Sequence, residues 1–238
     1  MCVRYTLHKT EAALAAMGRA LALNFATPEW VEPKYNITLT HVVPAVAALA
    51  GGPALRGMRW GLVPFYERNK VPGRMLPNAM AEKAVTSPAF REAVAQRRCL
   101  VPANGFYEWQ TLGKLKLPHL FTLKDEEPFA FAGVWDPAGD EQTPPAFAIL
   151  TTAPNALVAP IHDRMPVILT RETMRRWLGE VPLPAAEYQE LTKPLAVGRL
   201  QSRPVSRYVN SSRNQGPQCL EPPEPEPPPE PDLFGGLV

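Results

Sequence analysis

The start of the chain offers an unusual pair of nucleophiles. Cys2 follows Met1 directly, and cysteine is small enough for the initiator Met to be removed, which leaves a thiol and a free α-amine on one carbon. These groups have reference pKa values of about 8.5 and about 7.7–8.0, so both are partly deprotonated near neutral pH. An aldehyde can form an imine with the amine, and the thiolate can then close a five-membered thiazolidine. The alternative is a partly buried Cys on a first strand, packed as a small hydrophobe.

Two other residues, far from Cys2 in the sequence, have side chains suited to proton transfer. Glu108 lies inside the aromatic run 106–109, and burial against such rings raises the pKa of a carboxyl group and makes it a useful general acid. His162 precedes Asp163 and an apolar run, where a histidine can act as an acid or a base near neutral pH. The structural alternatives are a solvent-facing Glu on a half-buried strand and a histidine without a chemical role.

Aromatic and basic residues suggest a nucleic-acid partner. Trp60, Phe65 and Tyr66 could stack on unpaired bases, although aromatic residues at strand ends usually belong to the core. Residues 1–220 carry all 25 Lys and Arg residues and only 18 of the 23 Asp and Glu residues. This excess suits a polyanionic partner, and an ordinary basic surface explains it equally well.

Composition indicates a globular protein of the cytosol. The chain has 238 residues, of which 45% are hydrophobic, and no apolar run reaches the length of a membrane span. It lacks the pattern of a signal peptide. Its three cysteines have no zinc-ligand spacing, and an odd count argues against a disulfide framework. We therefore expect a cytoplasmic location, associated with the nucleoid in a bacterium, and no metal or cofactor.

The last 18 residues differ from the rest of the chain. From Glu221 onward the sequence alternates Glu and Pro and contains no Lys or Arg, so we expect a disordered tail over 221–238. Near its end, Asp232-Leu233-Phe234 has the character of a short peptide tag. Such a tag on a flexible tether suits a groove on another protein, such as a replication sliding clamp.

The predicted elements alternate without a regular βαβ rhythm. Apolar patterning predicts strands at 3–8, 35–40, 55–63, 99–102, 106–110, 119–124, 129–135, 146–152 and 204–210. Capping signals predict helices at 10–23, 87–96, 170–178 and 185–191, and residues 67–79 are predicted to be a loop. Residues 1–220 should therefore form a single α+β domain, with a curved, mainly antiparallel, barrel-like sheet flanked by helices.

Six sequence blocks together resemble the SRAP family, the SOS-response-associated peptidases or abasic-site-processing proteins. The blocks are Met1-Cys2-x-Arg4, Arg59-Trp60-Gly61-Leu62-x-Pro64, Asn78-Ala79-x-Ala81-Glu82, the run from Arg98 to Trp109, Ile161-His162-x-Arg164-Met165-Pro166, and Pro204-Val205-Ser206-x-x-Val209-Asn210. They occur in the family's order and span residues 2 to about 220. The Gly-Phe-Tyr-Glu-Trp and His-x-Arg-Met-Pro blocks are long and specific.

The resemblance implies a protein that captures abasic sites in single-stranded DNA. By this resemblance, Cys2 bonds covalently to the ring-opened sugar, and Asn78 orients the sugar and the amine. Glu108 transfers a proton in imine formation, and His162 acts as an acid and a base in ring opening and reversal. Self-removal of Met1 and a lyase side reaction are also implied. Arg4 and Arg164 become candidate contacts to DNA.

Three departures from the family pattern leave these four chemical residues unchanged. Val3 replaces a usual Gly, Met80 replaces a usual Arg, and Lys83 replaces a usual Thr. Because Met80 carries no positive charge, a contact to a DNA phosphate near the site is in doubt. Two other functions stay open, a non-covalent single-stranded DNA binder and an N-terminal-nucleophile cysteine amidohydrolase.

Overall fold

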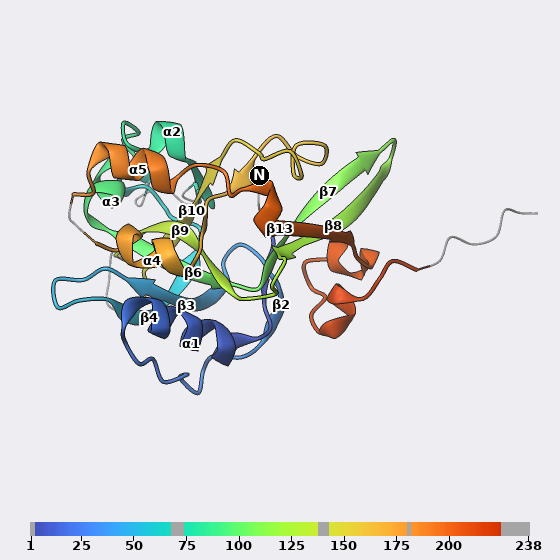
Figure 1. Ribbon diagram of the computed structural model, residues 1–238, viewed down its shortest axis with the longest axis horizontal. Helices are drawn as coiled ribbons and strands as arrows, with labels where there is room; N and C mark the ends of the chain where they lie inside the picture. The colour runs from blue at the N-terminus through green and yellow to red at the C-terminus, as the bar shows by residue number, and fades with distance from the viewer. Residues whose placement is uncertain (1–2, 68–73, 138–142, 180–181, 225–238) are drawn as a thin grey trace, which may run out of the picture.

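The computed structural model describes residues 3–67, 74–137, 143–179 and 182–224, which form two β-sheets and a set of short helices (Figure 1). Five strands form the smaller sheet, in the order β13 (Leu200–Pro204), β8 (Leu115–Leu123), β7 (Gly105–Leu112), β1 (Tyr5–Leu7) and β2 (Lys34–Ile37). All of its pairings are antiparallel. The β7–β8 hairpin projects from the body of the molecule.

Five strands of the larger sheet close into a barrel. The ring runs through β10 (Ala146–Thr152), β4 (Ala54–Trp60), β3 (Val42–Ala47), β6 (Arg98–Ala103) and β9 (Phe129–Asp136), and β9 pairs with β10 to close it. Three short strands extend this sheet, β5 (Asn78–Met80), β11 (Met165–Pro166) and β12 (Ile168–Leu169). Among the described strands, the parallel pairings are those of β10 with β4 and of β10 with β5. The predicted α+β class with a mainly antiparallel barrel-like sheet is confirmed.

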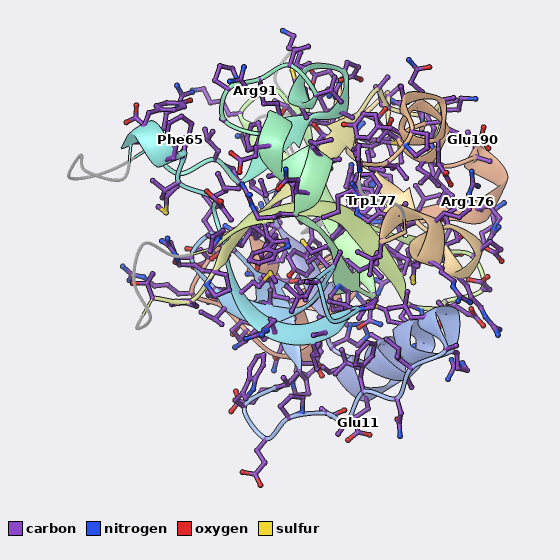
Figure 2. All side chains as sticks on the ribbon, turned by 90° about the vertical axis from the view of Figure 1, so that its left-hand side faces the viewer. Glu11, Phe65, Arg91, Arg176, Trp177 and Glu190 are labelled. Atoms are coloured by element: carbon purple, nitrogen blue, oxygen red, sulfur yellow. The ribbon has the colours of Figure 1, made fainter. Side chains whose placement is uncertain are left out.

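Helices cover the outside of the barrel. They are α1 (Thr10–Leu21), α2 (Ala81–Ala84), α3 (Arg91–Gln96), α4 (Arg171–Trp177) and α5 (Ala185–Leu191), with 3-10 turns η1 (Phe65–Glu67), η2 (Val197–Arg199), η3 (Arg207–Asn210) and η4 (Pro217–Leu220). Figure 2 shows Trp177 inside the molecule, where its indole Nε1 donates to Cys99 O at 3.0 Å. No helix in the described ranges is long and apolar enough to cross a membrane.

Strand alternation divides the core into two layers. On β9, Phe129 and Phe131 pack with aromatic residues of the smaller sheet, whereas Ala130 and Ala132 on the opposite face pack beneath the helices. Large side chains therefore fill the space between the two sheets, and small ones let the helices approach the barrel closely. This follows from the two-residue period of a strand, which sends successive side chains to opposite faces.

The helix predictions succeed where the caps are strong. The helix predicted from Thr170 begins there, with a capping box between Thr170 and Thr173, and α5 has the predicted bounds. The helix predicted over 10–23 begins at Thr10 and ends at Leu21. One start is wrong, because the helix predicted from Ser87 begins at Arg91, after a turn closed by Arg91 N–H on Ser87 O.

Two other element predictions need correction. Asn78 opens strand β5 and does not lie in a loop, because β10 supplies hydrogen-bond partners from about 70 residues further along the chain. The strand predicted over 204–210 ends at Pro204, and residues 207–210 form η3. Ser206 accepts a hydrogen bond from Tyr208 N, which starts that turn.

The predicted tail falls largely outside the description. Residues 225–238, including Asp232-Leu233-Phe234, lie outside the described residues, so the clamp contact stays a prediction. Residues 221–224 are described, and Glu221 O accepts a hydrogen bond of 2.8 Å from Ser206 N. The folded part of the chain therefore extends slightly past residue 220.

Candidate functional site

Strand β7 places a buried carboxyl group between the two sheets. Glu108 follows the core residue Phe106 by two positions, and the strand period turns both side chains to the inner face. Glu108 is 3% exposed, and its Oε1 has no hydrogen-bond partner in the described part of the chain. Burial raises the pKa of Glu108 to about 7, and the nearby negative charge of Asp163 adds to the rise. The predicted effect of burial is confirmed, and this carboxyl can exchange a proton near neutral pH.

Strand β1 leads the start of the chain toward this carboxyl. Tyr5 lies opposite Phe106, and Tyr107 N–H donates to Arg4 O at 3.1 Å. Continuing this antiparallel register by two residues places Val3, the first described residue, opposite Glu108. Cys2 lies outside the described residues, so its chemical role stays a prediction.

The segment before β11 presents His162. Its imidazole Nδ1 lies 3.0 Å from Arg164 N–H and 2.9 Å from Asp163 Oδ1. Burial lowers the pKa of His162, and the charge of Asp163 partly opposes this. The neutral ring accepts the Arg164 N–H at Nδ1 and carries its proton on Nε2, and the protonated ring can donate from Nδ1 to Asp163. Both protonation states therefore have a partner, as acid–base chemistry requires.

Arg164 anchors this segment to the rest of the site. Its guanidinium donates to both carboxylate oxygens of Glu82 at 2.8 and 3.0 Å and to Thr151 O at 2.6 Å. The Arg164 side chain is 14% exposed. Two parallel hydrogen bonds between a guanidinium and a carboxylate fix the relative orientation of the two groups as well as the distance between them. It ties the His162 segment to α2 and to the end of β10. A contact from Arg164 to DNA stays a prediction.

Asn78 reaches the same region from β5. It is 9% exposed and lies opposite Ile149 of β10. The preceding carbonyl, Pro77 O, accepts from the Trp60 indole at 2.9 Å, and the Trp60 ring meets Tyr5 edge-on at 5.2 Å. The Trp60 side chain therefore contacts both the residue before β5 and a residue of β1. β1 also pairs with β7, so Asn78 and Glu108 belong to one packed unit.

The residues predicted to bind DNA have different surroundings. Trp60 is fully buried, so it offers no face to a base and belongs to the core, which corrects the stacking prediction for that residue. Phe65 and Tyr66 are 64% and 48% exposed, and Figure 2 shows Phe65 at the edge of the molecule. Arg4 donates to Asn36 Oδ1 and Val209 O and lies over the Trp109 ring, so protein groups already occupy much of its guanidinium.

Sequence reasoning assigned no role to Glu82. It stands in the same block as Asn78, four residues later, and the Arg that it binds stands in the His162 block. The blocks that contain Asn78 and His162 also contain an acidic and a basic residue. This combination of charges could have indicated the ion pair between Glu82 and Arg164. Over the described ranges, no group of three or more His, Cys, Asp or Glu side chains could hold a metal ion.

The chain is similar to known proteins in both sequence and fold. The family model described as SOS response associated peptidase (SRAP) matches residues 1–212. The abasic site processing protein YoqW of Bacillus subtilis (strain 168) is 35% identical over 192 residues, which cover 79% of this chain and 86% of YoqW. The abasic site processing protein HMCES of Gallus gallus is 29% identical over 234 residues, covering 82% of this chain and 69% of HMCES. A crystal structure of a protein from Bacteroides thetaiotaomicron has a TM-score of 0.76 at 26% identity, covering 93% of this chain and 99% of that one.

Proposed function

The chain belongs to the SOS response associated peptidase (SRAP) family, and we propose that it processes abasic sites in single-stranded DNA by bonding covalently to them through Cys2. Relatives named for abasic site processing support the substrate class. The surplus of Lys and Arg over residues 1–220 suits a DNA strand. Cys2 lies outside the described residues, so its part rests on the sequence and on where β1 leads.

The proposed reaction has two bond-forming steps. Loss of Met1 frees the Cys2 α-amine, which adds to the aldehyde of the ring-opened sugar and releases water to give an imine. The Cys2 thiolate then adds to the imine carbon, forming a C–S bond while the nitrogen takes up a proton. The product is a thiazolidine, and no oxidant or reductant is consumed.

The observation that carries this proposal is the buried Glu108 carboxyl beside the start of β1. Its pKa of about 7 leaves a large fraction protonated at neutral pH, where an ordinary Glu is almost fully ionised. The acid form can protonate the hydroxyl that leaves as water when the imine forms. The resulting carboxylate can take a proton back from the nitrogen.

His162 and Asn78 have supporting roles in the proposal. With Nδ1 accepting from Arg164 N–H, the His162 ring carries its proton on Nε2, from which it can act on the sugar ring oxygen in opening and in reversal. Asn78 can hold the sugar and the Cys2 amine in place, since an amide both donates and accepts hydrogen bonds.

Two side activities belong to the same site. We assign removal of Met1 to hydrolysis of its own peptide bond at this site, which fits the peptidase description of the family. An imine that forms before the thiol closes can undergo β-elimination of the 3′-phosphate, which is a lyase reaction. Closure by the thiolate competes with this elimination and protects the strand.

A denaturing gel of the protein with abasic single-stranded DNA tests the proposal. Wild type should give an adduct that survives SDS and heat. Cys2→Ser should abolish it, because an oxygen ring closes less favourably and the imine then hydrolyses or eliminates. An N-terminal extension that blocks the α-amine should abolish it too.

Binding to an intact single strand is the control, because Cys2→Ser leaves the basic surface unchanged. A heat-stable adduct from either blocked protein would overturn the thiazolidine mechanism. Wild type that binds strands but never forms an adduct would point to a non-covalent binder. Wild type without DNA affinity would favour an amidohydrolase acting on a small amide.

A further inference from the structure

A cavity of about 600 Å3 lies between α2, α3 and α5. These three helices group together on one side of the larger sheet (Figure 1). The volume falls within the range of about 300–1,000 Å3 that is usual for small-molecule sites. The proposed chemistry at Cys2, Glu108 and His162 makes no use of this cavity.

The cavity walls are mainly apolar and contain one isolated hydroxyl group. Val85, Val94, Leu183 and Tyr188 supply apolar surface, and the Tyr188 hydroxyl donates to Ala81 O at 2.9 Å. Thr152 also lines the cavity and is 5% exposed. Its hydroxyl makes no hydrogen bond to any described residue. A hydroxyl that lines a cavity in this way can both donate a hydrogen bond to an occupant and accept one from it.

Positive charge dominates the rim of the cavity. Arg91 and Lys193 line it, and within the described ranges Arg91 makes no ion pair. Lys193 has only a 3.9 Å contact with Glu190 between two exposed side chains. Glu82 also borders the cavity, but Arg164 already holds its carboxylate. Arg91 and Lys193 are therefore the charged side chains on the rim that can face a bound molecule.

We propose that this cavity binds a small amphipathic anion, with an apolar body against Val94 and Leu183 and an acidic head group toward Arg91 and Lys193. A hydrogen-bonding group on the body would meet the Thr152 hydroxyl. The apolar walls supply most of the affinity, and the rim selects an anion over a cation of the same shape.

Glu82 connects this cavity to His162. Its carboxylate borders the cavity and holds Arg164, whose backbone N–H donates to His162 Nδ1. An anion on the rim repels the Glu82 carboxylate and changes its hold on Arg164. Occupancy should therefore alter the environment of the His162 ring. This part can be measured without DNA, so its failure is distinguishable from failure of the proposed function.

Calorimetry with decanoate and decyltrimethylammonium tests the binding site. Wild type should bind one decanoate and bind the cation at least about ten-fold more weakly. Arg91→Glu should weaken decanoate binding by about ten-fold, the size of a lost charge-assisted contact. Ala95→Trp, which fills the cavity, should abolish binding. The matched controls are Arg175→Glu and Ala15→Trp, at exposed helical positions away from the cavity, and they should bind like wild type.

Equal binding by Arg91→Glu and wild type, equal binding of both probes, or no binding of decanoate would each overturn the proposal. Arg91 is exposed, so its variant stays informative if Ala95→Trp fails to fold. For the connection to His162, an NMR titration of the histidine ring signals should show a His162 shift on adding decanoate. The shift should be absent in Arg91→Glu, and an unmoved His162 signal at saturation would remove the connection.

Discussion

Two glutamates on either side of the His162 segment have opposite surroundings. Glu108, on β7, is almost fully buried, its Oε1 has no hydrogen-bond partner among the described residues, and burial raises its pKa to about 7. Glu82, on α2, has a side chain that is 51% exposed and binds Arg164 through both oxygens. Its hydrogen bonds to Arg164 lower the pKa of Glu82.

The difference shows how one residue type can serve two purposes in one site. A carboxylate that faces a guanidinium stays charged at every physiological pH and can act as an anchor. A carboxyl whose burial outweighs the charges around it titrates near neutrality and can pass a proton. The neighbours, and not the residue type, decide which of the two a glutamate becomes.

The largest effect is expected when Glu108 loses its ability to titrate. Glu108→Gln should slow adduct formation by about 10²–10⁴-fold, the usual contribution of a positioned acid–base group, and leave binding to an intact strand unchanged. The advantage of wild type over the variant should shrink as the pH rises through about 7, because the acid form is lost. Single-turnover rates from pH 5 to 9 would check this. A wild-type rate in Glu108→Gln would remove Glu108 from the chemistry.

The same carboxyl should make unfolding depend on pH in a predictable direction. The folded pKa of about 7 lies above the ordinary value of 4.5, so the folded protein binds more protons between those values. Stability should therefore fall as pH rises from about 4.5 to about 7, by on the order of 3 kcal/mol, and this slope should vanish in Glu108→Gln. Urea unfolding of both proteins measures it. Glu92→Gln, which changes an exposed glutamate, should keep the slope.

A smaller effect is expected at the anchor. Glu82→Ala removes the carboxylate anchor of Arg164 and leaves its hydrogen bond to Thr151 O, so the His162 segment is held less firmly. Adduct formation or reversal should slow by about ten-fold, and stability should fall by about 1 kcal/mol. Since the pKa of Glu82 is lowered, its contribution is present above about pH 4.5 and is lost as the pH falls below that value.

Glu187→Ala is the matched control for the anchor. It breaks another Arg–Glu pair, with Arg176 at 2.8 Å, on α4 and α5. Its loss of stability should be similar, and its rates should match those of wild type. Equal rates in Glu82→Ala and Glu187→Ala would mean that the Glu82–Arg164 pair only stabilises the fold. A change in the pH profile of Glu82→Ala alone would show that the pair positions His162.

The smallest effect is expected at Met80, where β5 passes into α2 toward Glu82. Met80 is 38% exposed, and an Arg there could add one phosphate contact. Met80→Arg should tighten binding of single-stranded DNA at low salt and steepen the salt dependence by about 0.7, the value for one phosphate. The adduct rate at saturating DNA should not change. Parallel plots of affinity against salt for the two proteins would mean that Met80 does not face the backbone.

Local signals in the sequence determined much of this protein. The Thr170 cap, the helix at 185–191 and the alternating apolar strands are set by neighbours a few residues apart, so patterning predicts them. The aromatic flanks of Glu108 likewise predicted its burial and its raised pKa, because they lie within the same strand. The family resemblance rested on blocks that are each continuous in the chain.

Only the tertiary structure decided what depends on distant partners. β5 forms because β10 lies beside it, and Trp60 is a core residue because Tyr5 and Phe147 enclose it. The pairing of Glu82 with Arg164 joins residues 82 positions apart, and no local pattern states which Arg a Glu will meet. Burial, hydrogen bonding and charge at a site are sums over neighbours in space. The sequence by itself therefore predicted which residues do chemistry, and the fold decided that Glu108 is buried and that Glu82 binds Arg164.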